Sequence, residues 1–102
     1  MSSPPAPDAA DRALPLGQGA RGLAGVVVRV GAREGARPGL DPAELERRLL
    51  EMGFVEGADV RILHEGLFGG DPIAVRIGDF TVALRRREAD SVMVRVTEGG
   101  AR

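Results

Sequence analysis

The sequence contains no cysteine, tryptophan, tyrosine or lysine, and its single histidine is His64. Without cysteine the chain can form no disulfide, no thiolate metal site and no Cys nucleophile. Apart from His64, three phenylalanines are the only aromatic side chains, so platforms on which single-stranded bases could stack are scarce. No stretch approaches the roughly 20 apolar residues of a membrane-spanning helix. The first residues also lack the basic start and apolar centre of a secretory signal, so we expect no direct insertion into a membrane.

The charge balance gives a second exclusion. Lys and Arg number 14 against 15 Asp and Glu, for a formal net charge of −1. A protein that binds nucleic acid or an anionic membrane usually carries a clear excess of positive charge. Small barrels often bind nucleic acid, and that function would give salt-dependent binding to RNA or DNA. The charge balance argues against it, and we expect no nucleic-acid partner.

The 102 residues suit one domain, with a segment on either side. Residues 1–13 are rich in Pro and Ala and bury too little apolar surface to offset their ordering entropy, so we expect a disordered extension. We place the domain at residues 14–97 and expect a flexible tail at 98–102. Gly31 to Leu40 contains three Gly and one Pro, which predicts a loop.

One helix is predicted from Asp41 onward. Asp41 can cap the free N–H groups, Pro42 fits the first helical position, and Glu44 stands where a capping box needs it. An apolar stripe follows at helical spacing, and Gly53 is placed to end the helix. The residues of this stripe are Leu45, Leu49 and Met52.

The rest of the chain alternates with period two, which is typical of strands. The first strand is expected at Val26–Val30, and four apolar sets predict the others. These sets are Val60 and Ile62; Ile73, Val75 and Ile77; Phe80, Val82 and Leu84; and Val92, Val94 and Val96. Gly78 and Asp79 predict a two-residue hairpin turn of the primed type, and residues 86–90 a single helical turn. About five strands with one inserted helix predict a mainly β fold, a small closed or nearly closed barrel.

A search for catalytic groups finds almost nothing. His64 with Ser91, Ser2 or Ser3 is the only conceivable nucleophile and base, and nothing around Ser91 resembles a nucleophile elbow. His64, Glu65 and Asp71 lie close in the sequence, but one histidine without a second is weak evidence for a metal. The Gly-rich segment 66–72 lacks the Lys-Ser/Thr of a phosphate-binding loop and precedes a strand. We therefore predict no enzyme, no cofactor and no metal site.

Two features are candidates for contact with another protein. Leu67 and Phe68 lie in the Gly-rich loop, where they are either exposed for a partner or folded inward to cap the barrel. The Arg85–Arg87 run is too short for nucleic acid without interleaved aromatics, and Glu88 and Asp90 make it a partly neutralised, solvated turn. The candidate partner-binding residues are Leu67, Phe68, Asp71, Arg85, Arg86 and Arg87.

The second face of the predicted sheet is less polar than a solvated face should be. By parity it contains Val27, Leu63, Ala74, Ala83 and Met93. Some of these residues must lie under the helix or the N-terminal segment. The others are candidates for a patch that serves weak self-association or a partner.

Three segments together resemble the FeoA family. Residues 48–60 (RLLEMGFVEGADV) resemble its signature of Arg-Leu, Gly, an apolar pair, Gly and a strand. Residues 70–75 (GDPIAV) resemble its Gly-Asp-Pro strand entry, and residues 83–89 (ALRRREA) its closing turn. The likeness extends over roughly Leu16 to Val96 in the right order. The loop before Asp71 is one residue longer than the usual pattern, and the N-terminal extension is additional.

The resemblance implies an SH3-like barrel with an inserted helix. It also implies a small cytoplasmic accessory protein that binds and modulates FeoB, the membrane transporter of ferrous iron with a GTP-binding domain, which would recruit it to the inner face of the plasma membrane. A similar barrel forms the C-terminal domain of metal-dependent repressors, so a stand-alone regulatory module is the alternative. Repressors of that kind need a DNA-reading domain and a dimerisation domain, for which this chain has no room.

Overall fold

The computed structural model of the chain describes residues 12–31 and 41–102. Six strands form one antiparallel sheet in the order β1-β6-β2-β3-β4-β5. They are β1 (Ala13–Pro15), β2 (Ala24–Val30), β3 (Asp59–Gly66), β4 (Gly70–Ile77), β5 (Phe80–Leu84) and β6 (Val92–Glu98). The helices are the 3₁₀ turn η1 (Leu16–Gln18), α2 (Pro42–Met52) and α3 (Arg86–Ala89). Of the expected disordered extension 1–13, residues 1–11 lie outside the described part of the chain, and Ala13 is the first residue of β1. Residues 32–40, most of the expected loop, also lie outside it.

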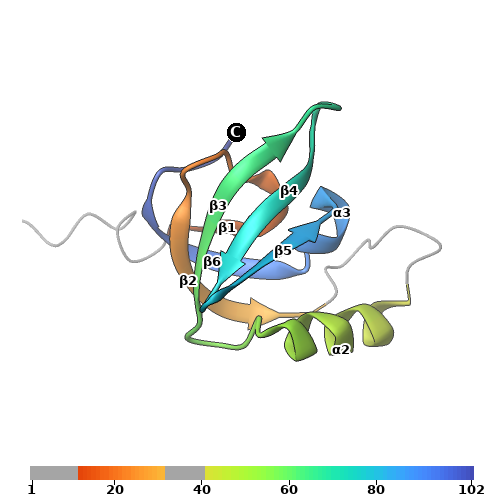
Figure 1. The fold of residues 1–102 in the computed structure, drawn as a ribbon. Coiled ribbons are helices and arrows are strands. Elements are labelled where there is room, and N and C mark those ends of the chain that lie inside the picture. The colour runs from red at the N-terminus through yellow and green to blue at the C-terminus, as the bar shows by residue number, and fades with distance from the viewer. Residues whose placement is uncertain (1–11, 32–40) are drawn as a thin grey trace, which may run out of the picture.

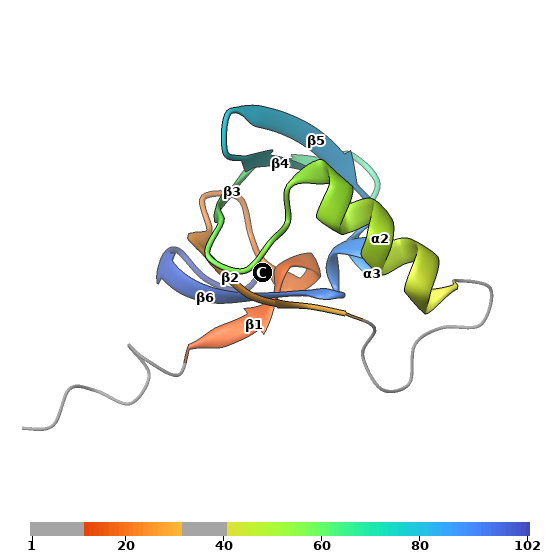
Figure 2. The same ribbon diagram turned by 90° about the horizontal axis from the view of Figure 1, so that it is seen from below.

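The sheet curves back on itself around one apolar core, which confirms the mainly β barrel. Strands β3, β4 and β5 form one wall, β1 and β6 lie on the other side, and α2 lies across one end (Figure 1 and Figure 2). The sequence predicts about five strands, and the structure adds β1, which pairs with β6. The core combines strand and helix side chains: Leu16, Leu23, Val27, Leu45, Leu49, Phe54, Val60, Ile62, Ile73, Val75, Ile77, Leu84, Ala89, Val92, Val94 and Val96.

Helix α2 has the start and the end that its sequence predicts. The Asp41 carboxylate accepts hydrogen bonds from the backbone N–H groups of Ala43 and Glu44, at 3.1 and 3.5 Å. These bonds satisfy two donors that a helix start leaves free. At the other end Gly53 adopts φ 109° and its N–H donates to the Leu50 carbonyl at 3.0 Å. Leu45 and Leu49 are buried, so the helix anchors one end of the barrel.

Gly53 provides a test of this helix end. We expect Gly53→Ala to lower the free energy of unfolding by about 1 kcal/mol, because a Cβ disfavours a positive φ. Asn tolerates the left-handed region better than Ala, so Gly53→Asn should cost less. Urea unfolding of both variants measures the difference. Equal losses in the two variants would contradict a conformational origin.

Two sequence-based expectations about the strand faces are wrong, because β-bulges shift the pairing. Parity places Val27 on the outer face, but Val27 is fully buried beside a register shift between Val27 and Arg29 in the pairing of β2 with β6. His64 was expected to continue the inward face of Val60 and Ile62. A register shift between Ile62 and His64 leaves His64 exposed. An extra residue reverses the alternation for every position beyond it.

The β4–β5 hairpin has the predicted two-residue turn, but Phe80, the first residue of β5, does not reach the core. Ile77 pairs with Phe80 across Gly78 and Asp79, and Gly78 has φ 58°. A positive φ at the first turn residue is typical of the primed hairpin turns. Phe80, expected on the inward face with Val82 and Leu84, is 71% exposed and lies directly beside the turn, at the closed end of the hairpin. Val82 is half-buried and Leu84 is buried.

The C-terminal residues, expected as a flexible tail at 98–102, pair with the N-terminal segment. Glu98 is the last residue of β6. The Ala20 N–H donates to the Gly100 carbonyl at 3.0 Å, and the Arg102 N–H donates to the Gln18 carbonyl at 2.9 Å. The end of the chain therefore lies beside η1, near the residues that flank the turn of the β3–β4 hairpin.

Candidate functional site

The β3–β4 hairpin ends in an apolar tip that projects from the barrel. Leu67 is 96% exposed and Phe68 is 87% exposed. Gly69 and Gly70 follow with φ 67° and 81°, so the turn uses two residues that tolerate positive φ. The sequence left open whether these side chains are exposed or fold inward to cap the barrel. In the structure both are exposed, and neither caps the barrel. Two large exposed apolar side chains at a loop tip are typical of a protein contact.

Arg86 clamps the base of this tip, the residues Glu65, Gly70 and Asp71 on either side of it, to the N-terminal segment. Its side chain is only 13% exposed. Nη1 donates to the carbonyls of Gly17 and Gly19 at 2.9 and 2.8 Å, and Nε donates to the carbonyl of Gly70 at 2.9 Å. Nη2 donates to Glu65 Oε1 at 2.7 Å. One guanidinium, with its planar set of five donors, thus joins three segments that are distant in sequence.

The backbone around Arg86 is packed as closely as its side chain. The Arg86 N–H donates to the Asp71 carboxylate at 2.9 Å, which ties the start of α3 to the start of β4. A Cβ on Gly17 would lie 2.1 Å from the Arg86 carbonyl oxygen, so η1 can approach α3 this closely only with glycine. The tip of the hairpin is exposed, but the base of this tip is held by several segments.

Glu65 is the acidic partner in this network. Its Oε2 accepts the Arg21 backbone N–H at 3.0 Å, and its Oε1 lies 2.7 Å from Arg86 Nη2 and 3.4 Å from Arg102 Nε. The Arg21 hydrogen bond is the largest influence and holds the pKa of Glu65 below its ordinary value of 4.5. The charges of Arg86 and Arg102 act in the same direction, while partial burial opposes them.

This lowered pKa predicts a pH dependence of stability. The ionised carboxylate stabilises the folded state above its unfolded pKa, and that contribution is lost as pH falls through the lower folded pKa. We therefore expect the urea midpoint to fall below about pH 4.5 partly because of Glu65. Glu65→Gln should flatten the loss in this window, and Glu56→Gln, at an exposed loop position, should not. Parallel pH profiles of wild type and Glu65→Gln would contradict the assignment.

The candidate residues of the sequence divide into two groups. One group is exposed and contains Leu67, Phe68, Arg85 and Arg87. The other group, Arg86 and Asp71, is half-buried in the base of the tip. The expectation of a uniformly solvated arginine turn is therefore wrong for Arg86. The sequence does contain one signal for this, because Arg86 stands three residues before the buried Ala89 and so shares its helix face.

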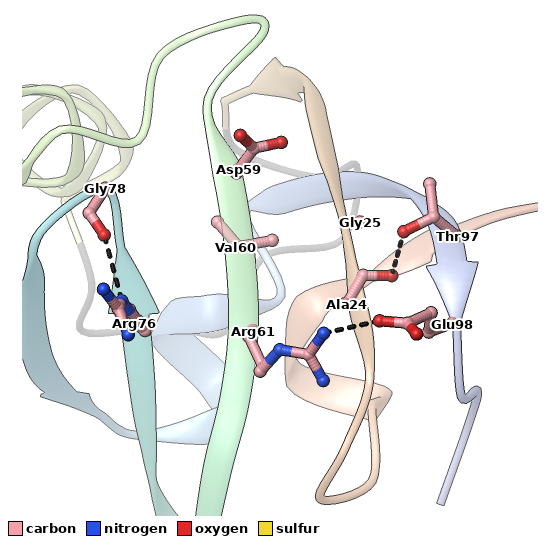
Figure 3. A pocket seen from close by; sticks show the side chains of 9 residues that line it. All are labelled: Ala24, Gly25, Asp59, Val60, Arg61, Arg76, Gly78, Thr97 and Glu98. Atoms are coloured by element: carbon pink, nitrogen blue, oxygen red, sulfur yellow. Dashed lines mark hydrogen bonds and ion pairs between the residues drawn. The ribbon is translucent and has the colours of Figure 1, made fainter.

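A shallow cavity of about 340 Å³ lies elsewhere on the barrel, over strands β2, β3, β4 and β6 (Figure 3). Arg61 forms an ion pair with Glu98 across β2, and Arg76 Nε donates to the Gly78 carbonyl at 3.2 Å. Asp59 also lines the cavity, so the lining contains two arginines and two carboxylates. None of the candidate residues that were predicted from the sequence lines this cavity. The hairpin tip therefore remains the candidate site.

In residues 12–31 and 41–102, no group of three His, Asp or Glu side chains is arranged to hold a metal ion. No helix in the same part of the chain is both long enough and apolar enough to cross a membrane.

Comparison with known families decides the identity of the domain. The model of the FeoA domain matches residues 14–96. The chain belongs to the FeoA family. The resemblance seen in the sequence is thereby confirmed, and the matched region contains the whole hairpin and its Arg86 clamp. A comparison with curated proteins found no match.

Solved structures of FeoA proteins share the fold. A crystal structure of an iron uptake regulatory protein (FeoA) is 25% identical with a TM-score of 0.64, over 83% of this chain and 97% of that one. The zinc complex of FeoA from Stenotrophomonas maltophilia is 34% identical with a TM-score of 0.61, over 78% of this chain and 86% of that one. That protein is described as a prokaryotic SH3 domain protein and a possible ferrous iron transport activating factor. The SH3-like fold is therefore confirmed.

A second class of proteins has a similar domain. A manganese-dependent transcriptional repressor is 25% identical with a TM-score of 0.64, over 95% of this chain but only 45% of the repressor. This FeoA chain thus corresponds to less than half of that protein.

Proposed function

We propose that this FeoA protein is a small, non-enzymatic cytoplasmic accessory protein that binds and modulates a FeoB-type ferrous iron transporter. The observation that supports this function is the exposed Leu67–Phe68 pair at the hairpin tip. Arg86 clamps the base of this tip. Exposed apolar side chains cost little in the free protein when they are few, and they gain free energy when a partner buries them. Membership in the FeoA family supplies the class of partner.

The roles of the candidate residues follow from their burial. Leu67 and Phe68 would enter an apolar pocket of the transporter, and Arg85 and Arg87 would lie at the rim of the contact. Asp71 and Arg86 would act indirectly, by holding the hairpin in one position. A preordered loop loses less conformational entropy on binding than a mobile one, so the clamp would raise affinity without contacting the partner.

The direct test is binding of the purified protein to the cognate transporter. We would measure it against the soluble GTP-binding domain and against the detergent-solubilised whole transporter, each with and without GTP and Fe(II). Saturable binding to either form supports the proposal, and its nucleotide dependence would show whether the barrel responds to the GTPase cycle. A folded protein that binds neither form in any condition would remove the proposed function.

One alternative function has a specific observation in its favour. The likeness to the repressor domain suggests a stand-alone regulatory module that binds a metal ion or another protein domain. Calorimetric titration with Mn(II) and Fe(II) separates the two functions. Binding of a metal ion by the isolated protein, without binding to the transporter, would favour the regulatory module.

A further inference from the structure

The two outer strands of the sheet are protected to different degrees. Natural proteins protect edge strands by making them short or by placing proline or charge on them. Strand β1 has three residues and ends in Pro15. Strand β5 has five residues, Phe-Thr-Val-Ala-Leu, with neither proline nor charge. In the described part of the chain, β5 pairs only with β4, so its second edge has no strand partner.

The free hydrogen-bonding groups on β5 can be identified from its pairing. Ile77 and Phe80 flank a two-residue turn, so they form a hydrogen-bonded pair, and such pairs recur at every second residue. Phe80, Val82 and Leu84 therefore direct their backbone N–H and C=O groups toward β4. Thr81 and Ala83 direct theirs outward, and both residues are exposed. The free edge thus offers two donors and two acceptors.

We propose that a second copy of this chain binds this edge, with the two β5 strands antiparallel about a two-fold axis at Val82. Thr81 of each copy then lies opposite Ala83 of the other copy. Each of these two pairs exchanges both backbone hydrogen bonds, which uses all the outward groups of both residues. The arrangement is isologous, as in most dimers.

The charges at the two ends of the strand favour a second copy as the occupant. In this register Asp79 lies opposite Arg85 of the other copy, at both ends of the interface. Both residues are exposed, and neither forms an ion pair within the described residues. A shift by two residues in one direction places Asp79 opposite Ala83. A shift in the other direction places it opposite Arg87, which lies within α3 and not beside the strand. The same register places Phe80, which is 71% exposed, beside Leu84 of the second copy.

The expected affinity is low. A five-residue strand pair buries less than the roughly 800 Å² per partner of a standard stable interface. We expect a dimer dissociation constant on the order of 10⁻⁴ M, so the protein would be monomeric when dilute and dimeric when concentrated.

The experiment is sedimentation equilibrium of the full chain from micromolar to millimolar concentration. Ala83→Pro removes one outward N–H from each copy and leaves the pairing with β4 intact, so it should weaken the dimer about 10-fold or more. Urea unfolding would check that each variant is folded. Thr81→Lys is a second variant, which adds charge at the edge without changing the backbone.

A charge reversal tests the register separately. Asp79→Arg alone places like charges opposite each other and should weaken the dimer about 5- to 10-fold. Adding Arg85→Asp restores opposite charges and should restore the wild-type constant. Glu56→Arg, a reversal at an exposed loop position, should change nothing. A monomer at all concentrations, or a dimer that neither Ala83→Pro nor Thr81→Lys weakens, would overturn the proposal. A dimer that those variants weaken but the double reversal does not restore would overturn the register.

Discussion

Arg86→Met is expected to lower the free energy of unfolding by about 3 kcal/mol, because it removes a mostly buried guanidinium that donates hydrogen bonds to four acceptors. The side chain is 13% exposed, so solvent screens its interactions far less than those of a surface arginine. Methionine keeps much of the volume but leaves the carbonyls of Gly17, Gly19 and Gly70 without this donor. It also leaves Glu65 without its closest charge partner. Urea unfolding at pH 7 measures the loss.

The neighbouring arginine supplies the matched control. Arg87→Met makes the same chemical change one residue along the same helical turn, at an exposed position, and should alter stability by less than about 0.5 kcal/mol. Arg86→Lys retains the charge but not the planar fork of donors, so it should recover only a small part of the loss. If Arg86→Met and Arg87→Met unfolded at the same urea concentration, Arg86 would not be the clamp that its contacts indicate.

The features that the sequence predicts well depend on neighbouring residues. The start of α2 depends on Asp41 and Pro42, which are adjacent, and its end depends on the φ of Gly53 alone. The β4–β5 turn depends on Gly78 and its two flanking strands. In each case the interaction that fixes the geometry lies within four residues along the chain. Local propensity and periodicity therefore suffice to predict it.

The features that the sequence does not predict depend on contacts across the barrel. The burial of Val27 follows from a bulge against β6, and the backbone of Val27 pairs with Gly57 and Ala58. No residue type marks that bulge in advance. In the Arg85–Arg87 run, three identical side chains have two different environments. Which of them is buried depends on carbonyls 67 and 69 residues away in sequence.

The candidate site shows both cases. Leu67 and Phe68 could be selected from the sequence as large apolar residues in a Gly-rich loop, but only the structure shows that they are exposed. The clamp below them is invisible in the sequence, apart from the three-residue spacing of Arg86 and Ala89. A recognisable loop motif can therefore nominate contact residues, while the residues that position the loop come from elsewhere in the chain.

The double variant Leu67→Asp with Phe68→Asp is expected to weaken binding to the FeoB-type transporter about 100-fold or more. Truncation of a central apolar contact costs roughly 2 kcal/mol or more at an interface, and an aspartate adds the cost of burying a charge. Because the two side chains are 96% and 87% exposed in the free protein, its stability should change by less than about 0.5 kcal/mol. Titration against the solubilised transporter, together with urea unfolding, measures both quantities.

The control for this variant places the same charges on another part of the surface. Leu50→Asp with Val55→Asp changes two side chains that are also exposed but lie on α2 and the loop that follows it. We expect this control to bind like the wild type. Equal losses in both double variants would mean that added negative charge weakens binding wherever it is placed, and the tip would lose its special role. Wild-type binding by the folded Leu67→Asp, Phe68→Asp protein would exclude the tip as the docking surface, because an apolar contact cannot survive two buried carboxylates. The Arg86 clamp would then serve the stability of the barrel alone.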